Sequence, residues 1–182
     1  SFFNTQFDFD YIIFSDVLEH LLNPAEVVFK FGEKLKKGGQ VLVSLPNIAH
    51  YDIINGLLNE KFNYSDMGLL DNTHLRFFTI SSFAEYIEAA NSENSYKFDL
   101  KLLGQTKINP PFIGEYPKLD EIIEKNPNLV VLQNIFSLEK IDKKMDTPNL
   151  IRLLNQDTLN LSEILNQKLD DLEKTKIINK SL

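Results

Sequence analysis

The sequence of 182 residues predicts an α/β fold, in which helices cover both faces of an open sheet. Residues 7–46 show an apolar run, an amphipathic segment with helix-start residues, and a second apolar run, which is the pattern of a βαβ unit. Two more strand candidates follow, separated by a segment rich in Pro. Because 43% of the residues are hydrophobic, the chain can bury the core of one domain.

The βαβ unit is defined by three segments. Residues 7–17 (FDFDYIIFSDV) are apolar on both faces, which suits a buried parallel strand. A helix is expected to begin at Asn23 and Pro24, a capping residue followed by a proline at the first helical position. The run KKGG at 36–39 is expected to stop this helix. Residues 40–47 (QVLVSLPN) form the second strand, parallel to the first through a right-handed crossover.

Further elements follow along the chain. A second helix is expected over 48–59, and a third helix begins at Thr79 or Ser82. The two later strand candidates are YKFDLKLLGQ at 96–105 and NLVVLQNIFSLEKI at 128–141, and INPPFIGEYPK between them is expected to be a loop.

The composition changes near the end of the chain. Leucine and isoleucine recur on one helical face over 161–172, among Asp, Glu, Lys, Asn and Gln. We therefore expect a first domain at 1–144 and a helical C-terminal extension at 145–182.

The bulk composition excludes some classes of protein. A net charge of −7 argues against a broad basic surface for nucleic acid, and the lack of cysteine excludes disulfides and thiolate chemistry. No apolar run approaches the roughly 20 residues that span a bilayer. A cytoplasmic location is the expectation. Since Ser1 precedes a strand pattern almost directly, we also expect that an earlier portion of the domain is absent.

Three motifs carry a family resemblance: SDVLEH at 15–20, LVSLPN at 42–47 and GLLDNTHLRFFT at 68–79. Together they resemble the C-terminal half of a class I S-adenosylmethionine-dependent methyltransferase, in the bacterial branch associated with sugar- and lipid-modifying enzymes. The resemblance extends over about residues 7–91. It implies a Rossmann-like sheet in the order 4-5-7-6 with the seventh strand antiparallel, in which 7–17 is the fourth strand.

The resemblance also implies S-adenosylmethionine as cofactor and a small-molecule or saccharide- or lipid-linked methyl acceptor. However, the family's glycine-rich turn after the first strand and the acid after the second have no counterpart here. Gly38 and Gly39 are expected only to end a helix. We therefore expect the chain by itself to be inactive.

The resemblance assigns roles to the polar residues that follow the strands, because ligands of open α/β sheets sit beyond the carboxyl ends of the strands. It implies that His20 and His74 are catalytic, since an imidazole can act as a base near neutral pH. The cofactor-binding candidates are Ser15, Asp16, Val17 and Leu18. The substrate-binding candidates are Glu19, Asn47, His50, Tyr51, Asp71 and Arg76, where Arg76 would hold a phosphate or carboxylate of the acceptor.

Two alternatives stay open. The spacing of Asp16, Glu19, His20 and His74 also resembles the metal site of small-RNA 2′-O-methyltransferases, which would make Glu19, His20 and His74 ligands of a divalent ion. In that family a Glu stands where this chain has Asp16. The other alternative is a non-catalytic remnant that serves as an interaction module. Independently of these alternatives, we expect a homodimer through the 7–17 strand edge or the C-terminal helix.

Overall fold

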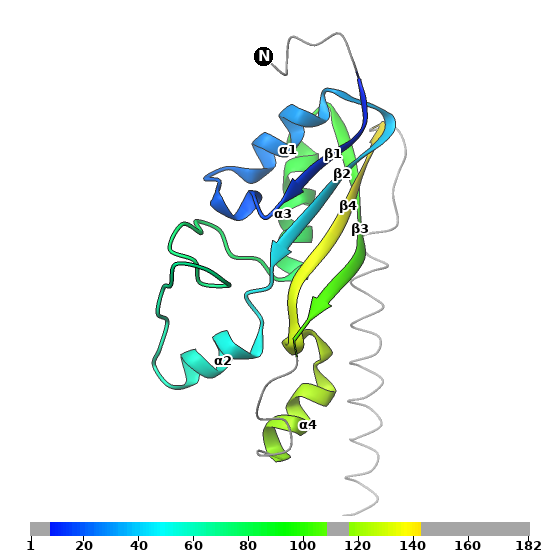
Figure 1. Cartoon of the computed structure of the whole chain (residues 1–182). Helices are drawn as coiled ribbons and strands as arrows, with labels where there is room; N and C mark the ends of the chain where they lie inside the picture. The colour runs from blue at the N-terminus through cyan, green and yellow to red at the C-terminus, as the bar shows by residue number, and fades with distance from the viewer. Residues whose placement is uncertain (1–7, 109–116, 143–182) are drawn as a thin grey trace, which may run out of the picture. The chain divides into compact units, whose positions relative to one another are not determined.

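The computed structural model describes residues 8–108 and 117–142 (Figure 1). Four strands form one sheet in the order β1-β2-β4-β3, with bounds β1 Phe9–Ser15, β2 Leu35–Pro46, β3 Tyr96–Lys107 and β4 Val131–Asp142. β1 runs parallel to β2, and β4 lies between β2 and β3, antiparallel to both. The predicted order 4-5-7-6 with an antiparallel seventh strand is confirmed.

The helices begin close to where the sequence predicts. α1 spans Pro24–Gly32, α2 spans Tyr51–Leu58, α3 spans Ile80–Glu93 and α4 spans Pro117–Lys125, with short 3-10 turns η2 at Leu18–His20 and η3 at Pro127–Val130. Thr79 caps α3 through a capping box with Ser82. α4 is an element that the sequence did not predict, because the prolines before it indicated a loop. η3 covers residues 128–130, which were expected to begin the last strand, and that strand starts only at Val131.

The run KKGG does not end α1, so this part of the prediction is wrong. α1 stops at Gly32, and Leu35 is already a buried residue of β2. The register with β1 shifts from Leu35 opposite Phe9 to Gln40 opposite Tyr11, so the residues between them form an irregularity within β2. Gly38 has φ 75°, and that left-handed backbone serves this irregularity instead of a helix end.

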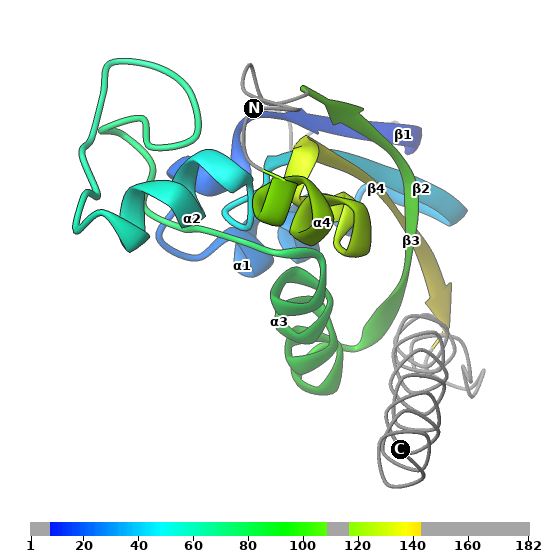
Figure 2. The same ribbon diagram turned by 90° about the horizontal axis from the view of Figure 1, so that it is seen from below.

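The helices α1 and α3 lie together on one face of the sheet (Figure 2). Phe83 of α3 packs against Phe136 of β4, with ring centroids 4.9 Å apart. Phe14 of β1 packs edge-on against Phe31 of α1 at 5.5 Å. This face holds the core, since the alternate residues of each central strand that point toward it are buried.

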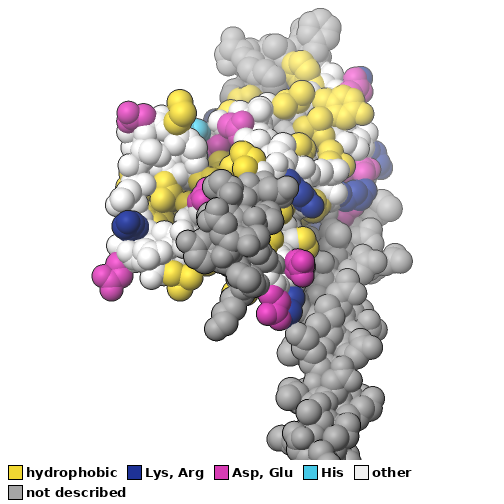
Figure 3. Space-filling view, turned by 60° about the horizontal axis from the view of Figure 1, so that its bottom comes forward, with side chains coloured by type: hydrophobic (Ala, Val, Ile, Leu, Met, Phe, Trp, Pro, Cys, Tyr) yellow, Lys and Arg dark blue, Asp and Glu magenta, His cyan; other side chains and the backbone are white. Residues whose placement is uncertain are grey.

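Among the described helices, α1 and α3 lie on the same face of the sheet, so helices on both faces are not seen in this part of the chain (Figure 2). Tyr11 and Ile13 of β1 point away from α1 and are 60% and 67% exposed. Hydrophobic side chains are visible on the molecular surface in Figure 3. β1 is parallel, as predicted, but it is half-exposed and lies at the sheet edge.

Two further predictions concern membrane spans and the C-terminal extension. No helix in the described ranges is long and apolar enough to cross a membrane. The expected helical extension at 145–182 lies outside the described residues, so the domain division stays a prediction.

Candidate active site

A pocket of about 260 Å³ opens at the carboxyl ends of β1 and β2. This is the edge at which open α/β sheets bind ligands. Its walls come from η2, from the end of β2, from the start of β4 and from the segment at 68–74. The lining residues are Asp16, Glu19, His20, Pro46, Gly68, Leu69, Asp71, His74, Leu132 and Gln133.

The stretch DNTHLRFFT at 71–79 is fastened onto the 3-10 turn that follows β1. The backbone N–H groups of Leu75 and Arg76 both donate to the carbonyl oxygen of Glu19, at 2.8 and 3.0 Å. The guanidinium of Arg76 donates through Nε and Nη2 to the carbonyl oxygen of Leu22, at 2.9 and 2.6 Å. Arg76 thus anchors the segment and is not among the residues that line the pocket.

Glu19 is a buried carboxylate at the centre of this junction. Its side chain is 1% exposed, and neither carboxylate oxygen has a hydrogen-bond partner within the described part of the chain. Burial raises the pKa of Glu19, because the charged form is poorly solvated there. Such an orphaned buried acid is costly in a protein, so it is a feature that needs a functional explanation.

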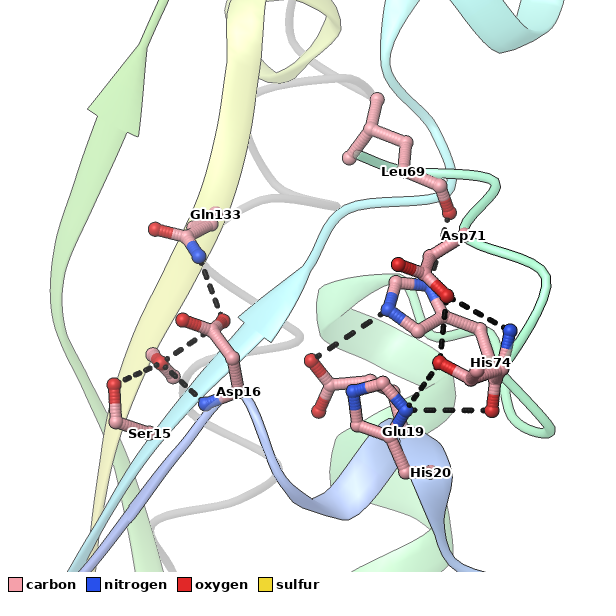
Figure 4. A network of polar contacts seen from close by, with 10 residues as sticks. Ser15, Asp16, Glu19, His20, Leu69, Asp71, His74 and Gln133 are labelled. Carbon is pink, nitrogen blue, oxygen red and sulfur yellow. Dashed lines mark hydrogen bonds and ion pairs between the residues drawn. The ribbon is translucent and has the colours of Figure 1, made fainter. Parts of the chain in front are cut away.

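Two histidines face this carboxylate (Figure 4). Nε2 of His74 lies 4.0 Å from Oε1 of Glu19, and the rings of His20 and His74 are 4.8 Å apart in an edge-on arrangement. One ligand-type atom from each of these three residues lies within 4.8 Å of the others. The structure therefore brings together the two predicted catalytic histidines and Glu19.

Asp16 occupies the other wall of the pocket in a strained backbone conformation. Its φ is 51°, in the left-handed region that a non-glycine residue seldom adopts. Its Oδ1 accepts from Nε2 of Gln133 at 2.7 Å and from Oγ of Ser44 at 3.2 Å, and its own N–H donates to Ser44 Oγ at 3.1 Å. Strands β2 and β4 therefore hold the Asp16 carboxylate in place.

The other predicted cofactor-binding residues differ in how accessible their side chains are. Ser15 Oγ lies 3.4 Å from Ser44 Oγ, close to Asp16, and Val17 is partly exposed. The side chain of Leu18 is fully buried in the core, so only its backbone can meet a ligand.

The residues present fit only part of a cofactor such as S-adenosylmethionine. Hydroxyl and carboxylate groups stand at the end of β1, but no described strand leads into a glycine-rich turn. The positive-φ glycines in the described ranges are Gly38, within β2, and Gly68, in the loop before α3. The described residues thus provide polar groups at the end of β1 and no glycine-rich cradle for the cofactor itself.

Besides Arg76, three predicted substrate-binding residues lie outside the pocket lining. Asn47 is buried, and its amide donates to the carbonyl oxygens of Asn128 and Val131 at 2.9 and 3.0 Å. His50 and Tyr51 are also buried, at the start of α2. Asn47 therefore joins β2 to the start of β4, which is a structural task.

The sequence reading missed Ser44, Thr73 and Gln133. Ser44 and Thr73 stand inside the quoted motifs, so their hydroxyl groups could have been noted there. Gln133 had no local signal, because it reaches Asp16 only when β4 inserts beside β2.

Comparisons with known proteins agree with this architecture. A protein-family model described as a methyltransferase domain matches residues 4–96, just over half of the chain. No curated protein matches the chain significantly.

Several solved structures are similar to the chain at low identity. The small RNA methyltransferase HEN1 has 17% identity and a TM-score of 0.42, over 76% of this chain and 14% of that one. A possible histamine N-methyltransferase from Thermotoga maritima has 12% identity and a TM-score of 0.46, with 78% and 62% covered. The plantazolicin methyltransferase BpumL has 14% identity and a TM-score of 0.43, with 76% and 56% covered. The chain thus spans less than two thirds of each of these proteins.

Proposed function

Because the chain belongs to the family of class I S-adenosylmethionine-dependent methyltransferases, we propose that its pocket is the acceptor side of a methyl-transfer site. S-adenosylmethionine is the cofactor of this family, and when bound it supplies the electrophilic methyl group. The remaining task belongs to the residues described above: to hold an acceptor oxygen or nitrogen in line and to take up its proton when it has one to lose.

The observation that carries this proposal is the buried Glu19 carboxylate facing His20 and His74 inside the pocket. Imidazole nitrogens are suited to accept a proton near neutral pH. Burial raises the pKa of Glu19, and in its ionised form the Glu19 carboxylate stabilises an imidazolium beside it. The three groups therefore form a proton-accepting centre in the pocket at the carboxyl ends of the strands.

The lining also favours one class of acceptor. Asp16, Glu19 and Asp71 contribute three carboxyl groups, whereas no Lys or Arg among the described residues lines the pocket. A phosphate or carboxylate next to the reacting atom would be repelled, while hydroxyl groups can donate to the carboxylates. The proposed acceptor is therefore a neutral, hydroxyl-bearing group, such as a saccharide or the sugar of a lipid-linked saccharide.

The first experiment is a methyl-transfer assay with labelled S-adenosylmethionine, carried out on this chain in its full coding context. Replacing His20 or His74 with Asn should lower turnover about 10²–10⁴-fold if that residue is the base. His50→Asn is the matched control, because His50 lies outside the pocket lining. Unchanged turnover in both the His20 and the His74 variants would overturn the proposal.

The acceptor class is tested separately by ligand titration. The chain has three histidines, so their ring resonances in NMR spectra are few and assignable. Neutral methyl glycosides should shift the His20 and His74 signals and leave His50 unmoved, whereas the corresponding sugar phosphates should bind more weakly. Equal or tighter binding of the phosphates would contradict a neutral acceptor.

A second candidate function is metal-assisted methyl transfer, as in an RNA 2′-O-methyltransferase. It is favoured by one observation, the unpartnered Glu19 carboxylate among two imidazoles, which is a ligand set that suits Mn²⁺, Mg²⁺ or Zn²⁺. Titration with Mn²⁺ should broaden the His20 and His74 signals at micromolar metal, and Glu19→Gln should abolish the effect while His50 stays sharp. Broadening that is equal at all three histidines would eliminate this candidate.

A further inference from the structure

The hydroxyl group of Thr73 lies between a carboxylate and a histidine of the pocket. Its Oγ1 donates to Oδ1 of Asp71 at 2.6 Å, and its backbone N–H donates to the same oxygen at 2.8 Å. These two hydrogen bonds, the hydroxyl first, lower the pKa of Asp71. Asp71 is therefore ionised near neutral pH and acts only as an acceptor, so the single hydroxyl hydrogen of Thr73 is directed toward it.

The oxygen atoms of Thr73 also contact the imidazole of His20. Nδ1 of His20 lies 3.0 Å from Thr73 Oγ1 and 3.3 Å from the Thr73 carbonyl oxygen. A carbonyl oxygen can only accept a hydrogen bond, and the Thr73 hydroxyl already donates its single hydrogen to Asp71. Both contacts consequently require that Nδ1 of His20 carries the hydrogen.

We propose that Thr73, oriented by Asp71, is a positioning residue that holds neutral His20 as the Nδ1–H tautomer and so leaves the Nε2 lone pair free. The significance of this lone pair rests on the proposed function, because a proton acceptor or a metal ligand needs an unprotonated nitrogen facing the reacting group. The opposite tautomer would present an N–H there and could do neither.

The other two histidines provide internal references. Nδ1 of His74 lies 3.2 Å from the carbonyl oxygen of Leu69, so His74 has the same Nδ1–H form. Nδ1 of His50 instead accepts from the backbone N–H of Asp52 at 3.4 Å, which places the hydrogen of His50 on Nε2. The chain therefore contains two histidines of one tautomer and one of the other.

The test is nitrogen-15 NMR of the histidine rings, in which protonated and unprotonated ring nitrogens have distinct shifts. Spectra are recorded at increasing alkaline pH, and the tautomers are read where the ring nitrogen shifts no longer change with pH. Single substitutions of His20, His50 and His74 assign the three signals. Thr73→Val removes the hydroxyl and keeps the side-chain shape, and Thr73→Ser keeps the hydroxyl.

In the unmodified chain, His20 and His74 should show a protonated Nδ1, and His50 a protonated Nε2. Thr73→Val should move His20 toward the Nε2–H form or a mixture of both, without changing His50 or His74, and Thr73→Ser should restore the original pattern. A His20 that is already Nε2–H, or one that Thr73→Val leaves unchanged, would overturn the proposal. Unchanged His50 and His74 signals show that the variant is folded.

This readout is independent of turnover. If the tautomers are as expected but the assay of the chain in its full coding context finds no methyl transfer, the proposed function fails and the positioning role of Thr73 stands. If methyl transfer occurs, Thr73→Val should lower its rate about tenfold or more at saturating acceptor, and Thr73→Ser should recover most of it. An unaffected rate together with an unaffected tautomer would remove Thr73 from the site.

Discussion

Nε2 of Gln133 donates a 2.7 Å hydrogen bond to Oδ1 of Asp16, across 117 positions of sequence. The contact joins β4 to the end of β1, although β2 lies between these strands. Asp16 needs such a partner, because its left-handed backbone is disfavoured for a non-glycine residue. The geometry of the pocket wall therefore depends on the insertion of the last strand into the sheet.

Replacing Gln133 with Glu should destabilise the chain. The donor is lost and a second carboxylate is placed beside Asp16, so we expect a cost of about 1 kcal/mol and a melting temperature lower by roughly 3–5 °C. Asp16→Asn in the same chain should recover most of the loss, since the new amide can donate to Glu at 133. The measurement is thermal unfolding of the single and double variants, and additive losses in the double variant would refute a direct contact.

His50 should make the stability of the chain depend on pH. Burial lowers its pKa below the ordinary 6.5, despite the Asp52 carboxylate 3.5 Å from Nδ1. The unfolded chain therefore binds a proton first as the pH falls. The contribution of His50 to the free energy of unfolding is therefore complete above about pH 6.5. It is lost as the pH falls below that value, with a slope of at most about 1.4 kcal/mol per pH unit.

The measurement is urea unfolding between pH 5 and 8, compared with His50→Asn. Asn also caps helices well, so this variant keeps the start of α2 while removing the titrating group. Its stability should vary less with pH in this window. A variant as pH-dependent as the unmodified chain would show that other groups are responsible.

The chain of 182 residues should bind S-adenosylmethionine weakly. The described residues provide no glycine-rich turn and no acid placed for the ribose, and each buried polar contact that is missing costs about 1–3 kcal/mol. Since about 1.4 kcal/mol is a factor of ten, several missing contacts turn a micromolar affinity into a millimolar one. Isothermal titration calorimetry that finds a micromolar dissociation constant for this chain would contradict the expectation.

The exposed edge of β1 should make the chain self-associate. β1 pairs only with β2 among the described strands, and Tyr11 and Ile13 are exposed on its open face. An apolar edge strand is a template for pairing with another chain. Light scattering should therefore report dimers or larger species, and Ile13→Lys should shift them toward monomer.

Ile12→Lys serves as the contrasting variant for this edge. Ile12 is only 9% exposed on the core face, so the same substitution there should unfold the chain instead of making it more soluble. A stable monomer of the unmodified chain at high concentration would end this idea.

The sequence predicted the order of the strands and the positions of most helix starts. The capped start of α3 and the apolar runs of β2 and β4 are local signals, so their elements lie close to where they were expected. The run KKGG failed, because a left-handed glycine serves a strand irregularity as well as a helix end. The glycine does adopt the left-handed conformation that the sequence predicted, but it lies within β2, because residues 35–46 pair with β1.

The site predictions divided in the same way. His20, His74 and Glu19 meet as the resemblance implies, and their functional roles stay predictions. Arg76 was expected to bind an acceptor, and this role stays a prediction; the structure shows its guanidinium donating to the carbonyl oxygen of Leu22. No property of the sequence near Arg76 reveals that oxygen, since the two residues are 54 positions apart.

The sequence by itself determined the kind and order of the elements, because periodicity, caps and turn residues act within a few positions of one another. It also determined that acids and imidazoles follow the strand ends. The tertiary structure alone decided which polar groups share the pocket and which are buried elsewhere, as Gln133 and Asn47 show. The reason is physical: the partner of a polar group is fixed by packing between segments far apart in the chain, and only the folded sheet brings those segments together.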